Sequence, residues 1–141
     1  MKTPGIKKLG GLLAALAFTA WASMPAFAET GQLIIKATGF QSDKGQALFA
    51  VVNSPEAYDD IGQKALAKSK QKITKGKAQT SFTLTYGWYA VSVVHDENNN
   101  LELDTNFLGL PQEPYGFSNN PKAVGKPSFA AVKFKLDASQ K

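Results

Sequence analysis

The sequence predicts an all-β fold, a small antiparallel β-sandwich with one short helix and one long ordered loop. Several short runs alternate apolar and polar residues or are rich in β-branched ones, and turn residues separate them. No strand-helix-strand rhythm occurs, which argues against a parallel sheet. We therefore expect two sheets packed face to face around one core.

The first two expected strands follow one another closely. Residues 32–38 are β-branched and partly alternating, whereas residues 46–53 form an almost continuous apolar run, typical of a strand covered on both faces. The turn signal Asp-Lys-Gly at residues 43–45 lies between them. We therefore predict that these two strands pair as a hairpin.

The one expected helix begins after the second strand. The run Ser54-Pro55-Glu56 combines a capping serine, a proline at the first helical position and an acid near the positive end of the dipole, which predicts a helix over residues 55–67. From Lys64 to Lys77 six lysines occur without an acid. This run indicates either a solvated face or a weak contact with an anionic membrane.

Three further strands are expected later in the chain. Residues 79–86 alternate well, with Phe82, Leu84 and Tyr86 on one side and hydroxyl residues on the other, which predicts one dry and one wet face. Residues 88–95 are rich in aromatic and β-branched residues, and residues 129–136 place apolar residues opposite lysines. The sequence thus predicts at least five strands.

The first 28 residues are typical of a removable secretory signal. Lysines at positions 2, 7 and 8 precede the uncharged run 9–21, and Ala26-Phe27-Ala28 supplies a signal-peptidase site. The uncharged run is too short for an ordinary membrane span. We expect residues 1–28 to be removed, and residues 29–141 to form a single β-sandwich domain, periplasmic or secreted, without a transmembrane segment.

Composition excludes several function classes. Three of the 16 basic residues lie in the leader, so the remaining chain has 13 lysines against 11 acids, a net charge of +2. All basic residues are lysines, and without arginine sequence-specific nucleic-acid binding is not expected. The absence of cysteine excludes thiol catalysis and cysteine-based zinc sites.

The segment between residues 95 and 128 has no sustained periodicity, and long ordered loops of this kind usually carry function. It opens with oxygen donors at positions 1, 3, 5, 7 and 9 of a calcium-type loop. The predicted metal ligands are Asp96, Asn98, Asn100, Glu102 through its carbonyl, and Asp104. Two departures occur, since Leu101 replaces the glycine of position 6 and Phe107 the glutamate of position 12.

Calcium is the ion we expect, because a flexible loop of oxygen donors suits a large hard cation. Asn106 and Glu113 are the nearest later residues that could supply a missing oxygen. The alternative is an Asn-rich turn whose side chains cap backbone amides without a metal.

The later part of the loop holds prolines and glycines that stiffen it. We name Tyr115, Phe117, Ser118 and Asn119 as candidate contacts for a protein or glycan partner. The alternative is that Tyr115 and Phe117 close the end of the sandwich.

The stretch YAVSVVHDENNNLELDTNFLGLPQEPYGFSNN, followed by GKPSFAAVKFKL, resembles the bacterial secreted family numbered 2141 among the domains of unknown function. The resemblance covers essentially the whole chain after the leader, and residues 95–120 carry its most specific part. It implies a sandwich similar to transthyretin-like and immunoglobulin-like domains, with no established activity. The family pattern usually has Asn-Gly where this chain has Asn100-Leu101.

Two function classes are thus expected. The first is a binding or interaction module in which a calcium-type loop holds the neighbouring segment rigid. The second is a hydrolase with His95 as general base and Asp96 or Glu113 beside it, or with Ser118 as nucleophile. Because His95 is the only histidine and no Gly-x-Ser-x-Gly motif occurs, the sequence favours the binding module.

Overall fold

The computed structural model describes residues 23–138. Most of the expected leader, residues 1–22, lies outside the described part, and residues 23–28 are exposed and without regular secondary structure. Within residues 23–138 the elements follow in the order β1 (Thr30–Thr38), β2 (Gln46–Val52), α1 (Pro55–Asp59), α2 (Ile61–Lys64), β3 (Ala67–Gln71), β4 (Lys77–Thr85), β5 (Gly87–Asp96), β6 (Tyr115–Phe117), α3 (Phe129–Val132) and β7 (Phe134–Leu136).

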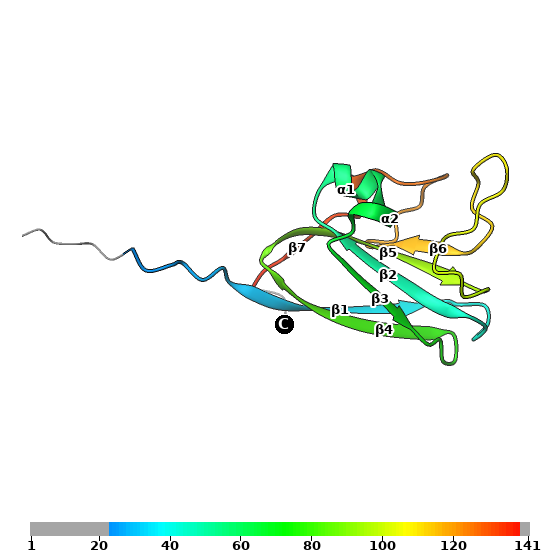
Figure 1. Ribbon diagram of the computed structural model, residues 1–141, viewed down its shortest axis with the longest axis horizontal. Helices are drawn as coiled ribbons and strands as arrows, with labels where there is room; N and C mark the ends of the chain where they lie inside the picture. Colours follow the sequence, from blue (N-terminus) through cyan, green and yellow to red (C-terminus); the bar gives the residue numbers. More distant parts are fainter. Residues whose placement is uncertain (1–22, 139–141) are drawn as a thin grey trace, which may run out of the picture.

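Two antiparallel sheets form the sandwich. β1 and β4 make a two-stranded sheet, and β3, β2, β5 and β6 lie in that order in a larger one, in which β7 also pairs with the start of β5. Figure 1 shows the β1–β4 sheet lying below the larger sheet. The predicted all-β sandwich is confirmed. None of the helices in the described range is long and apolar enough to cross a membrane.

The predicted hairpin between the first two strands is wrong. β1 pairs along its whole length with β4, from Thr30 opposite Thr85 to Thr38 opposite Lys77, whereas β2 pairs with β3 and β5. The turn signal at residues 43–45 therefore carries the chain from one sheet to the other. The Asp43 carboxylate accepts hydrogen bonds at 2.8 Å from the backbone N–H groups of the turn before β4, which fixes this crossing.

The helix predicted over residues 55–67 is shorter than expected. Ser54 caps α1 by accepting a hydrogen bond from the Ala57 N–H at 3.1 Å, but helical structure ends at Lys64. The lysine run becomes β3, because Lys68 and Lys70 alternate with smaller, half-buried residues. The lysines thus point outward along an edge strand of the larger sheet.

The strand predicted over residues 129–136 is also shorter. Its first four residues form the single helical turn α3, which buries Val132, and only Phe134–Leu136 pair with β5. The predicted side-chain alternation remains, since Val132 and Leu136 are buried and the lysines between them exposed.

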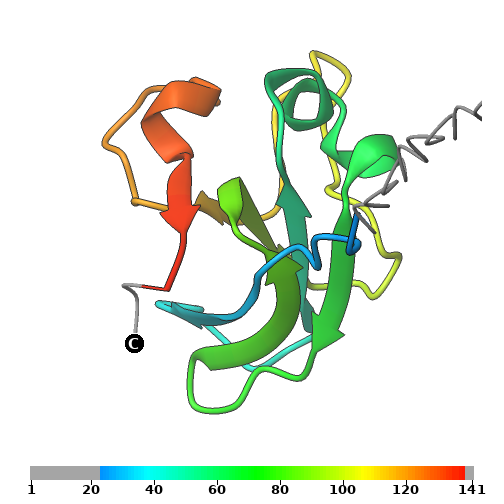
Figure 2. The same ribbon diagram turned by 90° about the vertical axis from the view of Figure 1, so that its left-hand side faces the viewer.

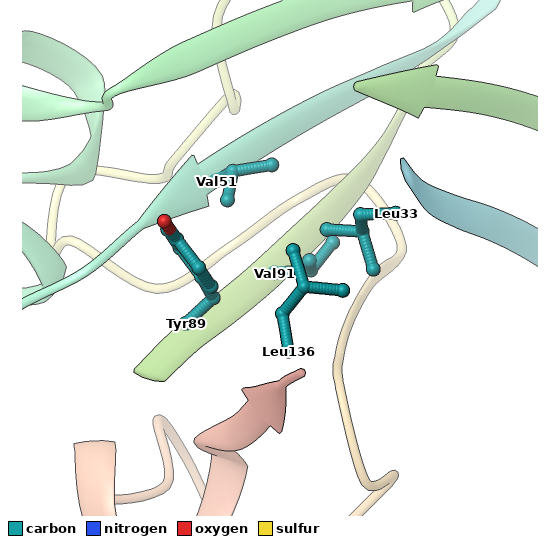
Figure 3. Close-up of a cluster of buried hydrophobic side chains, with 5 residues drawn as sticks. All are labelled: Leu33, Val51, Tyr89, Val91 and Leu136. Atoms are coloured by element: carbon teal, nitrogen blue, oxygen red, sulfur yellow. The ribbon is translucent and has the colours of Figure 1, made fainter. Parts of the chain in front are cut away.

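β2 and β5 carry core on both faces, as predicted for residues 46–53. Between the sheets, Leu33 reaches from β1 toward Val91 and Leu136 (Figure 3), in a cluster completed by Val51 and Tyr89. On the other face of the larger sheet, α1 and α3 cover a second cluster. Figure 2 shows all the helical turns on that side, away from β1 and β4.

Gly45 lets the start of β2 pass against the end of β5. Its φ is +71°, and a Cβ there would lie 2.0 Å from the backbone oxygen of Asp96 and 2.7 Å from the Cα of Glu97. Gly39 has a similar φ of +87° but faces open space. Of these two glycines, only Gly45 lies where an added side chain would collide with the backbone at the start of the long loop.

This pair gives a matched test of the packing. Gly39→Ala is expected to lower the free energy of unfolding by about 1 kcal/mol, the strain of a left-handed alanine, whereas Gly45→Ala adds displacement of the Asp96 backbone and should lose about 3 kcal/mol or more. Urea unfolding followed by circular dichroism measures both. Equal losses would mean that the close approach at Asp96 is absent.

Candidate functional site

The candidate site begins where β5 ends, at a fully buried carboxylate. Asp96 accepts hydrogen bonds from the Gln46 side-chain amide at 2.7 Å and from the N–H groups of Leu101 at 3.0 Å and Asn100 at 3.2 Å. Burial by itself raises the pKa of Asp96, but these hydrogen bonds outweigh it and hold the pKa below its ordinary value. Asp96 thus folds residues 96–101 back onto the strand end.

Three further predicted ligands lie in direct contact. The side-chain amides of Asn98 and Asn100 donate to the two oxygens of the Asp104 carboxylate, at 2.5 and 2.6 Å. The Oδ1 of Asn98 accepts from the Asn100 N–H, and the Oδ1 of Asn100 accepts from the Glu102 N–H, both at 3.0 Å. Each of these Oδ1 atoms keeps a second lone pair. The structure therefore places the side chains of Asn98 and Asn100 against the Asp104 carboxylate.

The backbone has the turn that position 6 of a calcium loop needs. Leu101, which stands there, has φ +69°, and the preceding Asn99 has φ +62°. A left-handed leucine costs about 1–2 kcal/mol relative to glycine. The Leu101 side chain is 56% exposed, so its bulk meets no crowding. The missing glycine therefore weakens the turn without abolishing it.

Glu113 fastens the far end of the loop to its beginning. Its side chain is buried, and its two oxygens accept from the Glu97 N–H at 2.8 Å and the Asp104 N–H at 3.1 Å. Asn106, the other later donor considered, instead accepts from the N–H groups of Leu108 and Leu110 at 2.9 and 3.0 Å. Glu113 is thus a neighbour of the predicted ligands, and Asn106 holds a separate turn.

The donor set consists of two carboxylates and two amides, with the carbonyl of Glu102 as a fifth oxygen. In residues 23–138, no three histidine, cysteine, aspartate or glutamate side chains come together in a way that could hold a metal. A hard cation that accepts neutral oxygens and water fits such a set better than a metal that prefers nitrogen or sulfur ligands.

Sequence reasoning missed an exposed apolar tip beside this loop, which we call the finger, residues 105–110. Phe107 is 94% exposed, Leu108 68% and Leu110 57%. Backbone hydrogen bonds join Asn106 to Leu110 and Gly109 to Asn106, both at 2.9 Å, so the tip has a defined turn. Figure 1 shows this yellow segment projecting from the end of the sandwich. The signal in the sequence was an uncharged Phe-Leu-Gly-Leu in a segment without periodicity.

The four predicted partner-contact residues lie in and after β6. Tyr115 is 40% exposed and contacts the edge of Phe117, whose ring also packs against Tyr58. Ser118 accepts from the Val91 N–H at 2.9 Å and donates to the carbonyl of residue 132 at 2.6 Å. The Asn119 amide donates to two carbonyls at the end of α3. Of these residues, Tyr115 and Asn119 are exposed, whereas Phe117 and Ser118 are half-buried.

The groups of the alternative hydrolase make hydrogen bonds with other parts of the fold. The Nε2 of His95 donates to the carbonyl of Lys44 at 2.8 Å, since a carbonyl can only accept. Its buried Nδ1 has no hydrogen-bond partner among residues 23–138, and the nearest charged atom is a Glu97 oxygen at 3.9 Å. In that part of the chain no hydrogen bond links His95 with Asp96 or Ser118.

The lowered pKa of Asp96 predicts a pH-dependent contribution to stability. Asp96→Asn should lower the free energy of unfolding near pH 7 by about 2 kcal/mol, because a charged acceptor gives hydrogen bonds worth about 1.5–3 kcal/mol. A depressed folded-state pKa contributes stability that is full above the unfolded-state pKa, about 3.9, and is lost as the pH falls through the folded-state value.

Urea unfolding in the presence of chelator, near pH 7 and again near pH 3, measures this contribution. The difference between wild type and variant should shrink at the lower pH, and the exposed Asp59→Asn should show almost no difference at either. A difference that is the same at both pH values would contradict the assigned role of the Asp96 charge.

Comparison with known proteins gives one match. A family model described as an uncharacterized protein conserved in bacteria (DUF2141) matches residues 35–141. No curated protein and no solved structure matches the chain. The matched range begins within β1 and includes the rest of the sandwich, the predicted ligands and the finger. Because it spans more than half of the sequence, the chain belongs to this bacterial family of uncharacterized proteins.

Proposed function

We propose that the protein is a periplasmic or secreted interaction module in which Ca²⁺ strengthens a loop that presents the finger to a partner. The ion would be held by the predicted ligands, the side chains of Asp96, Asn98, Asn100 and Asp104 and the carbonyl of Glu102. It would supply no chemistry beyond cross-linking these oxygens. The leader-like residues 1–28 support the proposed location.

The observation that carries the proposal is the contact of both Asp104 oxygens with the amide groups of Asn98 and Asn100. Side chains that merely cap their own turn do not need a common carboxylate. The Oδ1 of each amide already accepts a backbone N–H, so a cation beside the Asp104 carboxylate would use the second lone pair of each Oδ1.

The affinity should be low. Ca²⁺ takes six to eight oxygens, and the loop offers four side chains and one carbonyl, with Phe107 in place of the usual bidentate acid. Water must complete the shell. We expect a dissociation constant in the range of extracellular calcium modules, about 10⁻⁴ to 10⁻³ M.

The finger is the surface that an ion bound in the loop would help to hold in place. A projecting turn that exposes Phe107, Leu108 and Leu110 has no role in the core, and contiguous exposed apolar side chains usually mark a contact site. The loop base at Asp104 connects directly to it, because the Gln112 N–H donates to the Asp104 carbonyl at 2.7 Å. The apolar character of the finger favours a protein partner over a glycan.

Calcium titration tests the ion. In chelator-treated protein, Ca²⁺ at about 100 times its dissociation constant should stabilise the fold by about 2.7 kcal/mol. For a domain of this size the melting temperature should rise by about 10 °C. The same titration should slow proteolysis within residues 96–113.

Asp104→Asn provides the matched variant, because it keeps the size of the side chain and removes a ligand charge. It should lose most of the calcium response, whereas the exposed Asp59→Asn should keep it. If calcium changes neither melting temperature nor proteolysis of the wild type, the proposed ion is wrong.

The finger gives a separate prediction. The double variant Phe107→Ser, Leu108→Ser should melt within about 1 °C of the wild type and keep the calcium response, because substitutions of exposed residues usually change stability by less than about 0.5 kcal/mol. Differential scanning calorimetry measures both. A loss of several degrees would mean that these side chains pack in the folded protein and are not presented to a partner.

A further inference from the structure

The sandwich is open along one side. The smaller sheet ends in β1, which pairs only with β4, and the larger sheet ends in β6, which pairs only with β5. In the described part of the chain, no backbone hydrogen bond is made on the other edge of β1. Two strand edges with unpaired N–H and C=O groups therefore border the same opening.

A cleft of about 520 Å³ lies in this opening. Its floor includes Val91, Val93 and His95, which lie on one face of β5. Its wall includes every residue from Leu33 to Thr38, although successive residues of a strand point to opposite faces. The edge of β1 itself, with its backbone groups, therefore forms the wall. Another extended backbone is the chemical complement of such a wall.

The other edge of the larger sheet is protected, whereas β1 is not. Lys68, Lys70 and Lys72 line the β3 edge, and Ser69 there accepts a hydrogen bond from Thr80 of β4 at 2.9 Å. Lysines on an edge are a common protection against strand pairing. β1 has nine residues, one lysine and no proline, and its register with β4 is unbroken.

We propose that β1 pairs antiparallel with β1 of a second copy of this chain, about a two-fold axis at Ile34. Ile34 is the central residue of β1 and is 51% exposed on the outer face. In this register the two Ile34 side chains meet, Lys36 of each copy lies opposite Gln32 of the other, and Thr30 lies opposite Thr38. The strand's only charge thus faces a neutral amide, and no like charges are opposed.

The pairing completes what each copy lacks. It joins the small sheets into one four-stranded sheet in the order β4, β1, β1, β4, and it covers both Ile34 side chains. The same surface is used on both copies, as a closed two-fold dimer requires. One strand pair is a small interface, so we expect a transient dimer with a micromolar dissociation constant. This dimer does not depend on calcium.

Analytical ultracentrifugation tests the pairing. The wild type should show a concentration-dependent monomer–dimer equilibrium. Ile34→Lys and Ile34→Glu should each raise the dissociation constant by about tenfold or more, because like charges then meet at the axis, and an equal mixture of the two variants should restore the dimer. Ser81→Lys is the control, since Ser81 lies opposite Ile34 on β4, on the same exposed face but one strand away from the free edge of β1.

A single cysteine tests the register, because the chain has no other. Ile34→Cys should form a disulfide-linked dimer on mild oxidation. Lys36→Cys should not, because the two positions lie about 13 Å apart along paired strands. A wild type that stays monomeric up to millimolar concentration would overturn the proposal. So would a dimer that Ile34→Lys leaves intact, or equal cross-linking at both positions, since either result would mean that the two copies do not pair about Ile34.

Discussion

Two buried carboxylates, those of Asp96 and Glu113, hold the long segment after β5 in one conformation. Together their four oxygens accept hydrogen bonds from one side-chain amide and from backbone N–H groups at both ends of residues 96–104. Burying a carboxylate is favourable only when such donors satisfy it. The loop therefore depends on these two acids more than on apolar packing, since most of its own large apolar side chains are exposed: Leu101, Phe107, Leu108 and Leu110.

The sandwich supplies a hydrogen-bond donor to Asp96 and the fixed strand end at which the loop begins. Gln46, at the start of β2, reaches the Asp96 carboxylate, and Gly45 before it permits the two backbones to approach. His95 adds a hydrogen bond to the Lys44 carbonyl from the preceding residue of β5. A loop anchored in this way begins at a rigid point. The predicted ligands and the finger follow within a few residues. The backbone would therefore carry the stabilising effect of an ion bound by the ligands to the finger.

Periodicity allowed much of the fold to be predicted. Residues 79–86 alternate because one face of β4 covers the core and the other meets solvent, and residues 46–53 are continuously apolar because β2 is covered on both faces. The pairing of the strands could not be predicted in this way, because a turn signal indicates that the chain changes direction but not which strand it joins. β3 was missed because its lysines hid the small inward residues, and α3 because its burial pattern also fits a strand.

The candidate site could likewise be predicted from the sequence only in part. Asn98, Asn100 and Asp104 lie in contact for local reasons, so their grouping could be predicted from polar residues at alternate positions of a short turn. The hydrogen bond from the Glu97 N–H to the Glu113 carboxylate joins residues 16 positions apart. It could not be predicted, because it depends on how the segment returns to pair with β5 as β6. The free edge of β1 likewise follows from pairings between strands far apart in the sequence.

The central claim is that Asp96 and Glu113 organise the loop and that a cation adds to their effect. Amide hydrogen exchange at Glu97, Leu101 and Asp104, followed by NMR with chelator and then with Ca²⁺, measures this at the three N–H groups concerned. The account predicts slowed exchange at all three without the ion and further slowing with it. Exchange at unprotected rates in chelator, unchanged by calcium, would contradict it.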